Sequence, residues 1–314
     1  MIENSAYKNK NCVVTGGSGF IGQNLVKKLL DGGANVYVID NFSFGAKKTD
    51  VDRRANIIES DVRDWKGFEK LPAVKYDYLF HFAAPSSIVI FNKEPEECSD
   101  ITVNGFLNAL RFCEEKNARL VYPSSGKVYL GVEPPHSEHM KLDYDALDNY
   151  AKAKFEIEKA QAKRGKNANI LGLRIFAGYG PGEEHKNESA SVPYLFCKKM
   201  LNGEPPVIFG DGNQIRDFIY IDDVVNAILI LGERAKEPIV NVGRGEATSF
   251  NELAETINRI LETEIEPIRV NKPVSYAEKT LAGTTLLEKY HTPEFSLEEG
   301  LKLTITHIKN SATS

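Results

Sequence analysis

The sequence lacks any apolar run that approaches the ~18 residues needed for a membrane-spanning helix. Its polar first ten residues lack the apolar core of a signal peptide, so we expect a cytoplasmic protein with no membrane partner. The four cysteines show no CxxC spacing, which favours neither a zinc site nor a disulfide framework, and we assign no metal ligands. The formal net charge of −5 gives no broad basic surface for nucleic acid.

What remains is the composition of an ordinary globular protein. The 314 residues are 42% hydrophobic and 26% charged, which is enough to bury a large core. This length exceeds the usual size of one domain, so we expect one large domain or two interlocked domains.

A glycine-rich stretch between a short apolar strand and an amphipathic helix is the most informative feature. Strand residues 12–15 lead into glycines at positions 16, 17, 19 and 22, and apolar residues follow at helical spacing. Such glycines permit positive φ and close approach of a ligand, and free N–H groups at a helix start attract phosphate. A plain tight turn is the alternative. We assign cofactor contacts here to Gly16, Gly19, Phe20, Ile21 and Gly22.

The next predicted strand, residues 35–40, ends in a carboxylate about 20 residues after the glycines. At this offset Asp40, with Asn41 beside it, can accept hydrogen bonds from the ribose of an adenosine. Its charge would repel the 2′-phosphate of NADP, although basic residues follow at 47–48 and 53–54. The sequence therefore predicts a dinucleotide site that prefers NAD to NADP.

Further strands alternate with helices along the first half of the chain. Residues 56–62, 78–84, 120–125 and 169–176 are predicted strands, and residues 96–116 are a predicted long helix. This alternation predicts an α/β fold with a doubly wound, mostly parallel sheet, in which ligands bind at the carboxyl ends of the strands. The strand-end residues that we assign to the cofactor are Asp61, Val62, Phe82, Ala83, Ala84 and Phe176.

Some polar residues near strand ends have competing explanations. Asp61 can meet the adenine amino group or cap the helix that begins near Asp64, and the sequence favours neither. His81 lies in an apolar strand, which is more typical of a buried structural histidine than of a catalyst. We expect Asp222 and Asp223 to cap the helix that follows them.

A tyrosine and a lysine share one face of the helix predicted to begin at residue 149. Tyr150 and Lys154 have i,i+4 spacing. An adjacent ammonium and an oxidised nicotinamide would both favour the phenolate, so Tyr150 can act as a general base. Ser125 can hydrogen-bond the same substrate oxygen. Together the three residues predict hydride transfer at an alcohol carbon, whereas each alone is compatible with a surface or strand-end role.

With these motifs in sequence order, the chain resembles the extended short-chain dehydrogenase/reductase family, especially its UDP-glucose 4-epimerase-like nucleotide-sugar epimerases and its dehydratases. The matching segments are residues 15–22, 40–43, 61–64, 81–84, 124–125, 150–154, 173–181 and 216–224. The resemblance implies NAD as cofactor and a Rossmann-type domain over residues 1–176, with 213–245 returning to it. It also implies a smaller α/β substrate-binding domain over residues 177–314, and a homodimer.

The resemblance also indicates where a nucleotide-diphosphate sugar would bind. It assigns substrate contacts to Ser87 and Ser125, base contact to Phe209 and diphosphate contact to Arg216. Core packing is the alternative for Phe209. Lys272 stands where many relatives carry a second diphosphate-binding arginine, and lysine lacks the planar fork of a guanidinium.

By the same resemblance, the expected reaction is epimerisation at C4 of the sugar. Tyr150 takes the hydroxyl proton as hydride passes to NAD, and the hydride returns to the opposite face of a 4-keto sugar. Dehydratases place Asp-Glu after the catalytic hydroxyl and decarboxylases usually keep a glutamate, whereas Gly126 and Lys127 follow Ser125 here. Dehydration, decarboxylation and net keto-sugar reduction are the alternatives on this scaffold. A catalytically inactive dinucleotide sensor is the alternative of another class, and the intact Tyr150 and Lys154 disfavour it.

Overall fold

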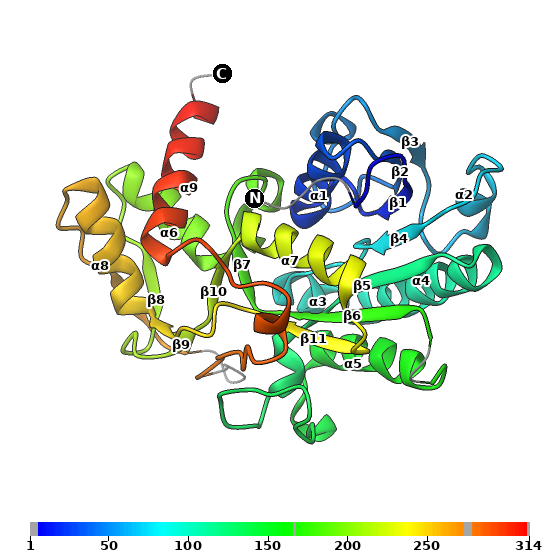
Figure 1. Ribbon diagram of the computed structural model, residues 1–314. Helices are drawn as coiled ribbons and strands as arrows, with labels where there is room; N and C mark the ends of the chain where they lie inside the picture. Colours follow the sequence, from blue (N-terminus) through cyan, green and yellow to red (C-terminus); the bar gives the residue numbers. More distant parts are fainter. Residues whose placement is uncertain (1–5, 166–167, 273–277, 313–314) are drawn as a thin grey trace.

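Seven parallel strands form the central sheet, in the order β11-β6-β5-β4-β1-β2-β3 (Figure 1). The structure is a computed structural model that describes residues 6–165, 168–272 and 278–312. The chain winds outward in both directions from the junction of β1 and β4, which confirms the predicted doubly wound sheet. The strands of the sheet are β1 (Asn11–Thr15), β2 (Asn35–Asp40), β3 (Asn56–Glu59), β4 (Tyr78–His81), β5 (Arg119–Ser125), β6 (Ile170–Ile175) and β11 (Ile239–Val242).

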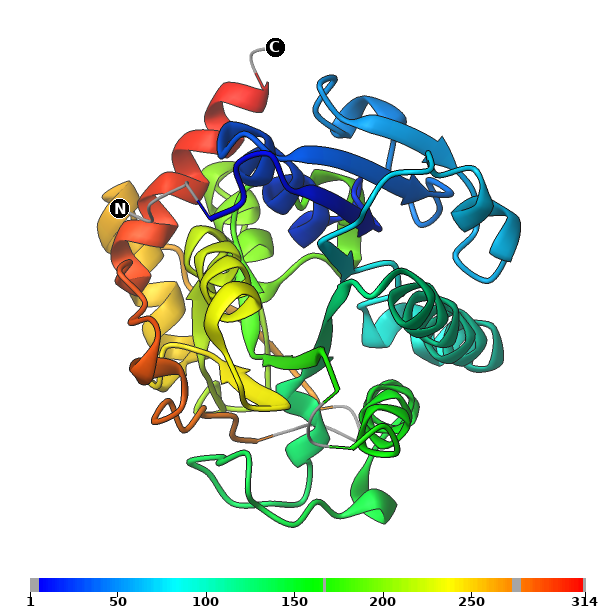
Figure 2. The same cartoon turned by 45° about the vertical axis from the view of Figure 1, so that its right-hand side comes forward.

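Helices cover both faces of this sheet (Figure 2). On one face lie α1 (Phe20–Asp31) and α7 (Ile221–Arg234), and on the other lie α2 (Trp65–Glu69), α4 (Pro95–Lys116) and α5 (Asn149–Ala162). Successive residues of β1 enter opposite cores, because Val13 packs on the α4 side and Val14 on the α1 side. A sheet buried on both faces requires such continuous apolar strands.

Most of the remaining elements gather beside the sheet, at the left of Figure 1, whereas α3 packs on α4 and α5. The helices α6, α8 and α9 pack on one another, and β7, β9 and β8 each pair with one short strand of this region. β11 and α7, which belong to the returning segment 213–245, lie with the central sheet. The domain boundary at residue 176 itself stays a prediction. The bounds are α3 (Ile88–Lys93), β7 (Ala177–Tyr179), α6 (Val192–Leu201), β8 (Val207–Phe209), β9 (Ile215–Arg216), β10 (Phe218–Tyr220), β12 (Thr248–Ser249), α8 (Phe250–Leu261), β13 (Ile268–Val270) and α9 (Leu297–Ala312).

The helix cap considered for Asp61 is wrong. The N-cap of α2 is Asp64, whose side chain accepts the N–H of Lys66 at 3.0 Å. Strand β3 ends at Glu59, earlier than predicted, so Asp61 lies in the loop that leads to this cap. Its carboxylate is therefore available for other partners at the edge of the sheet.

The predicted cap by Asp222 and Asp223 is also wrong. Helix α7 has Tyr220 at its N-cap position and no side-chain cap. Asp223 is fully buried and accepts the N–H groups of Glu294 and Phe295 at 2.8 and 3.0 Å. The carboxylate thus fastens the segment before α9 to α7, a partnership between residues about 70 positions apart that capping statistics cannot reveal.

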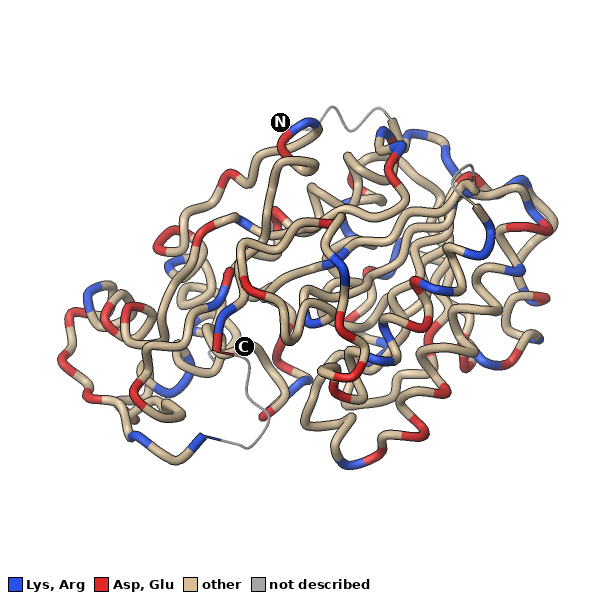
Figure 3. Tube along the Cα trace, turned by 90° about the horizontal axis from the view of Figure 1, so that it is seen from below, with Lys and Arg blue, Asp and Glu red and all other residues tan. Residues whose placement is uncertain are grey.

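The surface carries both signs of charge, with Lys and Arg interspersed among Asp and Glu along the trace (Figure 3). Within the described ranges, none of the helices has the length and apolar character to cross a membrane. The four cysteines are buried and unpaired, as expected. The first five residues of the polar start lie outside the described residues.

Candidate active site

The glycine-rich turn joins β1 to α1 at the carboxyl edge of the sheet. Gly16 has a φ of 71°, and a Cβ added to it would stand 2.6 Å from the nitrogen of Ala83. A Cβ on Gly22 would lie 1.9 Å from the carbonyl oxygen of Gly16. Both glycines are therefore required by the fold of the turn itself.

Gly19 differs, because the surrounding protein leaves room for a side chain there. Its φ is −72°, and the nearest atom to an added Cβ is the Gly16 carbonyl oxygen at 3.4 Å. In the described chain no side chain caps α1, and the N–H groups of Phe20 and Ile21 have no acceptor within the helix. An anion that approached these donors would occupy the space next to Gly19. The turn therefore fits the pyrophosphate of a dinucleotide.

Asp40 is buried at the end of β2, next to this turn. One carboxylate oxygen accepts the N–H and the hydroxyl of Ser18 at 2.9 and 2.6 Å, and the other accepts the N–H of Phe42 at 2.8 Å. These bonds use three of about four acceptor positions of a carboxylate. Asp40 thus holds the turn in place and keeps acceptor capacity for a ribose hydroxyl.

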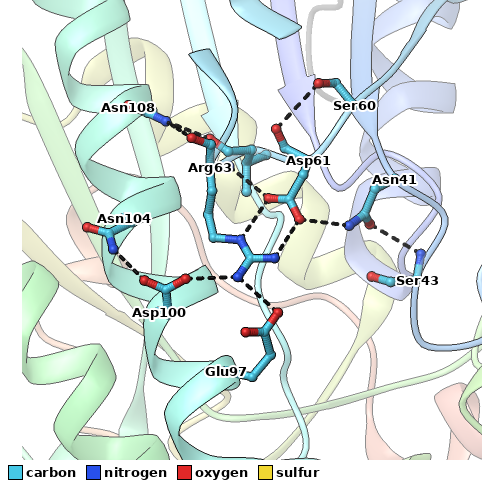
Figure 4. Close-up of polar contacts among 10 residues, drawn as sticks. Asn41, Ser43, Ser60, Asp61, Arg63, Glu97, Asp100, Asn104 and Asn108 are labelled. Carbon is cyan, nitrogen blue, oxygen red and sulfur yellow. Dashed lines mark hydrogen bonds and ion pairs between the residues drawn. The ribbon is translucent and has the colours of Figure 1, made fainter. Parts of the chain in front are cut away.

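A charged cluster occupies the loop after β3 (Figure 4). Arg63 donates to Asp61 at 3.1 and 2.9 Å, and its guanidinium lies 2.8 Å from Asp100 and 2.9 Å from Glu97, both on α4. Asn41 also donates to Asp61, at 3.3 Å. The hydrogen bonds from Arg63 lower the pKa of Asp61, so this carboxylate is ionised at neutral pH. With the Arg63 N–H at 2.8 Å, four donors fix Asp61 in place, so a ligand would have to share or replace one of them, such as the exposed amide of Asn41.

The residues after β4 border the same turn. The Ala83 N–H donates to the hydroxyl of Thr15 at 3.3 Å, and that hydroxyl pairs with Nδ1 of His81 at 2.8 Å. Burial and, to a smaller extent, the charge of Lys154 together lower the pKa of His81 to about 3, so the ring is neutral. His81 has the structural role predicted for it. Residues 82–84 are half-buried, as is the side chain of Ile21.

The three predicted catalytic residues meet at the carboxyl end of β5. Ser125 ends this strand, and Tyr150 and Lys154 lie in the first turns of α5. The Ser125 hydroxyl is near enough to the Tyr150 phenol to lower the pKa of that phenol. Lys154 is buried, its Nζ donates to the Pro123 carbonyl at 3.0 Å, and the same atom lies 5.9 Å from the centroid of the Tyr150 ring. A serine hydroxyl, a phenol and an ammonium therefore share one site.

The pKa of Tyr150 differs from the sequence expectation. Burial raises this pKa, the nearby Ser125 hydroxyl opposes that effect, and the charge of Asp148 raises the pKa further. The ammonium of Lys154 is directed to a carbonyl, and burial lowers its own pKa to about 8. In the protein without cofactor, Lys154 thus does not lower the pKa of Tyr150 towards neutral pH. Formation of the phenolate needs a further positive charge.

Behind the serine lies a buried ion pair. Arg174 of β6 donates to Glu158 of α5 at 3.0 and 2.7 Å, and the two side chains are 6% and 5% exposed. Ser124 donates to the same carboxylate, and Arg174 donates to the hydroxyl of Tyr129 at 2.7 Å. These bonds fix β5 and α5, which carry the predicted catalytic residues, relative to each other.

The residues assigned to substrate lie in two places. Phe209 ends β8, and the next residue, Gly210, would place an added Cβ 2.3 Å from the side chain of Lys272. Lys272 pairs with the carboxylate of Glu278 at 2.8 Å, and Arg216 donates to the carbonyl of that residue at 3.4 Å. Phe209, Arg216 and Lys272 thus belong to one group of neighbouring residues.

Ser87 and Phe176 lie elsewhere. Ser87 caps α3, and its hydroxyl accepts the N–H of Val89 at 3.1 Å. The ring of Phe176, after β6, lies over the residue that follows Ser125, because a Cβ on Gly126 would stand 3.0 Å from it. Phe176 therefore packs directly beside the serine.

Sequence reasoning missed the partner of the residue before the catalytic helix. Asp148 caps α5 by accepting the N–H of Ala151 at 2.8 Å, and its second oxygen pairs with Nζ of Lys127. An aspartate just before a helix is a visible capping signal. The lysine 21 positions earlier carries no such signal.

The sequence matches a known protein family and several named relatives. Residues 12–243 match the model of the NAD dependent epimerase/dehydratase family. The chain is 34% identical over 270 residues to ADP-L-glycero-D-manno-heptose-6-epimerase of Brachyspira hyodysenteriae, which covers 80% of this chain and 81% of that protein. It is 29% identical to UDP-N-acetyl-alpha-D-glucosaminuronate decarboxylase of Bacillus cytotoxicus, over 94% of this chain and 97% of that protein.

A solved structure of a relative has the same fold. UDP-glucose 4-epimerase of Thermotoga maritima, determined with UDP-glucose, matches with a TM-score of 0.86 and 29% identity, over 96% of this chain and 99% of that one. The family description names NAD, the cofactor that the sequence predicted. The relatives catalyse different reactions, so their names do not select one reaction. The fold, the glycine-rich turn and the match over most of the chain lead to one conclusion: this chain belongs to the NAD dependent epimerase/dehydratase family.

Proposed function

We propose that the protein is an NAD-dependent nucleotide-sugar epimerase that inverts C4 through a 4-keto intermediate. The observation that carries this proposal is the convergence of Ser125, at the end of β5, with Tyr150 and Lys154 of α5, where Nζ of Lys154 lies 5.9 Å from the centroid of the Tyr150 ring. Groups that meet one alcohol oxygen can guide its proton while the adjacent carbon is oxidised. The Thermotoga maritima relative, a 4-epimerase, supports the choice of reaction.

Each catalytic side chain has one task in the proposed cycle. Tyr150 takes the proton of the sugar hydroxyl and later returns it, while the Ser125 hydroxyl holds the same oxygen. Lys154 keeps its ammonium at neutral pH, since its pKa of about 8 lies above that value. Bound NAD supplies the hydride acceptor and donor, so no net redox change results.

The two residues after Ser125 favour epimerisation over elimination. Gly126 has no side chain, and Lys127 is paired with Asp148. Elimination needs a group that protonates the leaving hydroxyl, and a paired ammonium is poorly suited to that task. Dehydration is therefore disfavoured strongly, and decarboxylation, the reaction named for the Bacillus cytotoxicus relative, moderately.

We propose that NAD lies along the carboxyl edge of the sheet. The N–H groups of Phe20 and Ile21 would hold the pyrophosphate, Asp40 a ribose, and Asp61 the adenine amino group. The carboxylate of Asp40 would repel a 2′-phosphate, so we expect NAD to bind more tightly than NADP. Val62 and the residues at 82–84 would line the same edge.

We propose that residues 177–314 form the substrate-binding domain. Arg216 and Lys272 supply positive charge for a diphosphate, and Phe209 a ring surface for the base. Ser87 would contact the sugar from the other side of the site. We also propose a homodimer, for which light scattering at micromolar concentration should give twice the mass of the chain.

The proposed reaction is tested with a panel of nucleotide sugars. Purified protein should convert at least one of them into its C4 epimer, as identified by NMR, without accumulation of NADH. A 4-keto-6-deoxy product or loss of CO₂ would replace epimerisation with dehydration or decarboxylation. Tight NAD binding without turnover of any sugar would favour the inactive sensor.

Replacing Gly19 with alanine should weaken NAD binding and leave the fold intact. The new Cβ meets only the Gly16 carbonyl at 3.4 Å, but it would stand beside the proposed pyrophosphate. Loss of one or two charge-assisted hydrogen bonds lowers affinity by about 10- to 100-fold, which calorimetric titration with NAD would measure.

Gly22→Ala is the matched contrast for this test. Its Cβ would overlap the Gly16 carbonyl at 1.9 Å, so this variant should lower the unfolding temperature even without NAD. If Gly19→Ala kept the affinity of the unaltered protein for NAD, the pyrophosphate could not lie at this helix start.

A further inference from the structure

One ion pair connects the two chain segments that carry the serine and the tyrosine. Lys127 lies in a short 3-10 helix, η2 (Gly126–Tyr129), directly after β5, and its Nζ pairs with Asp148, the N-cap of α5. The two side chains are 20% and 23% exposed, so the pair is largely shielded from water.

Both ends of this pair also contact the catalytic segments through the backbone. The N–H of Lys127 donates to the hydroxyl oxygen of Ser125 at 3.2 Å. On the other side, Asp148 accepts the N–H of Ala151 and so fixes the first turn of α5, where Tyr150 lies. A shift of either segment would therefore be transmitted to the other through Lys127 and Asp148.

We propose that Lys127 is a positioning residue, which fastens the Ser125 turn to the helix of Tyr150 and offsets the charge of Asp148 next to the phenol. The proposal rests on the proposed role of Tyr150 as the base. It assigns a task to a lysine that stands where an acid would be needed for elimination.

The proposed effect of Lys127 on the charge near Tyr150 follows from the groups that surround the phenol in the described structure. From β5 comes the Ser125 hydroxyl, and from α3 the uncharged ring of Phe91 packs against the phenol with centroids 5.3 Å apart. From α4 comes the thiol of Cys98, which is neutral because burial raises its pKa. From α5 itself come the carboxylate of Asp148 and the ammonium of Lys154. Lys127 of η2 reaches the site through Asp148, and His81 behind Lys154 is neutral.

Removal of the Lys127 charge would therefore leave a carboxylate without its counter-charge near a group that must become an anion. This makes the phenolate harder to form. In Lys127→Gln, Tyr150 should lose its proton at higher pH than in the unaltered protein. In Asp148→Asn, which keeps a capping side chain, it should lose its proton at lower pH.

The test is a titration of Tyr150 followed by NMR of protein labelled with ¹³C at Cζ of tyrosine. The signal is assigned with Tyr150→Phe, and the titration is run on the protein alone and on the NAD-saturated protein. We expect the Tyr150 midpoint to rise in Lys127→Gln, to fall in Asp148→Asn, and to return towards the original value in the double variant. Lys127→Arg should restore the original midpoint.

Lys159→Gln is the matched control, because Lys159 pairs with Glu156 on the exposed face of the same helix. It should leave the midpoint unchanged. Below the midpoint, turnover by Lys127→Gln should fall by about three- to tenfold, in proportion to the phenolate fraction. Equal midpoints in the unaltered protein and Lys127→Gln would overturn the proposal. Because the titration needs no sugar, a shifted midpoint without turnover would refute the proposed function and leave the role of Lys127 standing.

Discussion

Tyr150→Phe should convert nucleotide sugars about 10² to 10⁴ times more slowly than the unaltered protein, because it removes the proposed general base. At about 1.4 kcal/mol for each tenfold change, this is about 3–5 kcal/mol of activation free energy. The ring stays in place against Phe91, with which it makes an edge contact at a centroid distance of 5.3 Å. Initial rates with the best substrate of the panel measure the effect.

Two further measurements distinguish loss of the general base from loss of the fold or of NAD binding. The unfolding temperature and the affinity of Tyr150→Phe for NAD should stay close to those of the unaltered protein. Lys154→Ala should lose turnover as well, and should also bind NAD more weakly, because we propose that its ammonium contacts the nicotinamide ribose. If Tyr150→Phe turned over sugar at nearly the original rate, the proton would have to leave through another group.

Arg174→Met should lower the free energy of unfolding by about 3–5 kcal/mol, since it leaves a buried carboxylate without its counter-charge. Glu158 is 5% exposed and would keep Ser124 as a donor, which is too little for a full negative charge away from water. Urea unfolding at neutral pH, monitored by circular dichroism, measures the loss.

A surface pair between the segment just after α5 and helix α4 provides the control. Arg164 pairs with Glu114 while 37% and 51% of these side chains are exposed, so Arg164→Met should change stability by less than about 1 kcal/mol. Arg174→Met combined with Glu158→Leu should recover much of the loss, because no charge is then left buried. A similar small effect of Arg174→Met and Arg164→Met would show that the buried pair is not important for stability.

Much of the architecture was predictable because its signals are local. The turn of residues 16–22 is coded by glycines at fixed spacing, and the shared helix face of Tyr150 and Lys154 follows from four positions of separation. The strands alternate with helices closely enough that the parallel sheet follows from periodicity. Strand ends were less accurate: β3 ends three residues before the predicted position.

The unpredicted features depend on segments that meet only in the folded chain. Asp223 looked like a cap but accepts N–H groups about 70 residues later, and Arg63 reaches carboxylates on α4. Asp61 could not be assigned, because an aspartate before a helix suits a cap and a ligand contact equally well. The pKa of Tyr150 likewise depends on burial and on Asp148. The spacing of residues in the sequence reveals neither the direction in which a side chain points nor how deeply it is buried.

The place of β11 in the sheet determines which fragments of this protein can exist. It pairs with β6 although more than 60 residues separate them, and α7, which precedes it, covers the same side of the sheet as α1. A chain cut after residue 176 would leave β6 as an open edge with unpaired backbone groups and expose the apolar surface under α7. Such edges pair with other chains, so we expect the fragment to aggregate when expressed alone. We therefore expect residues 1–176 to be obtainable only together with residues 213–245, through co-expression or a linker that bypasses the segment between them.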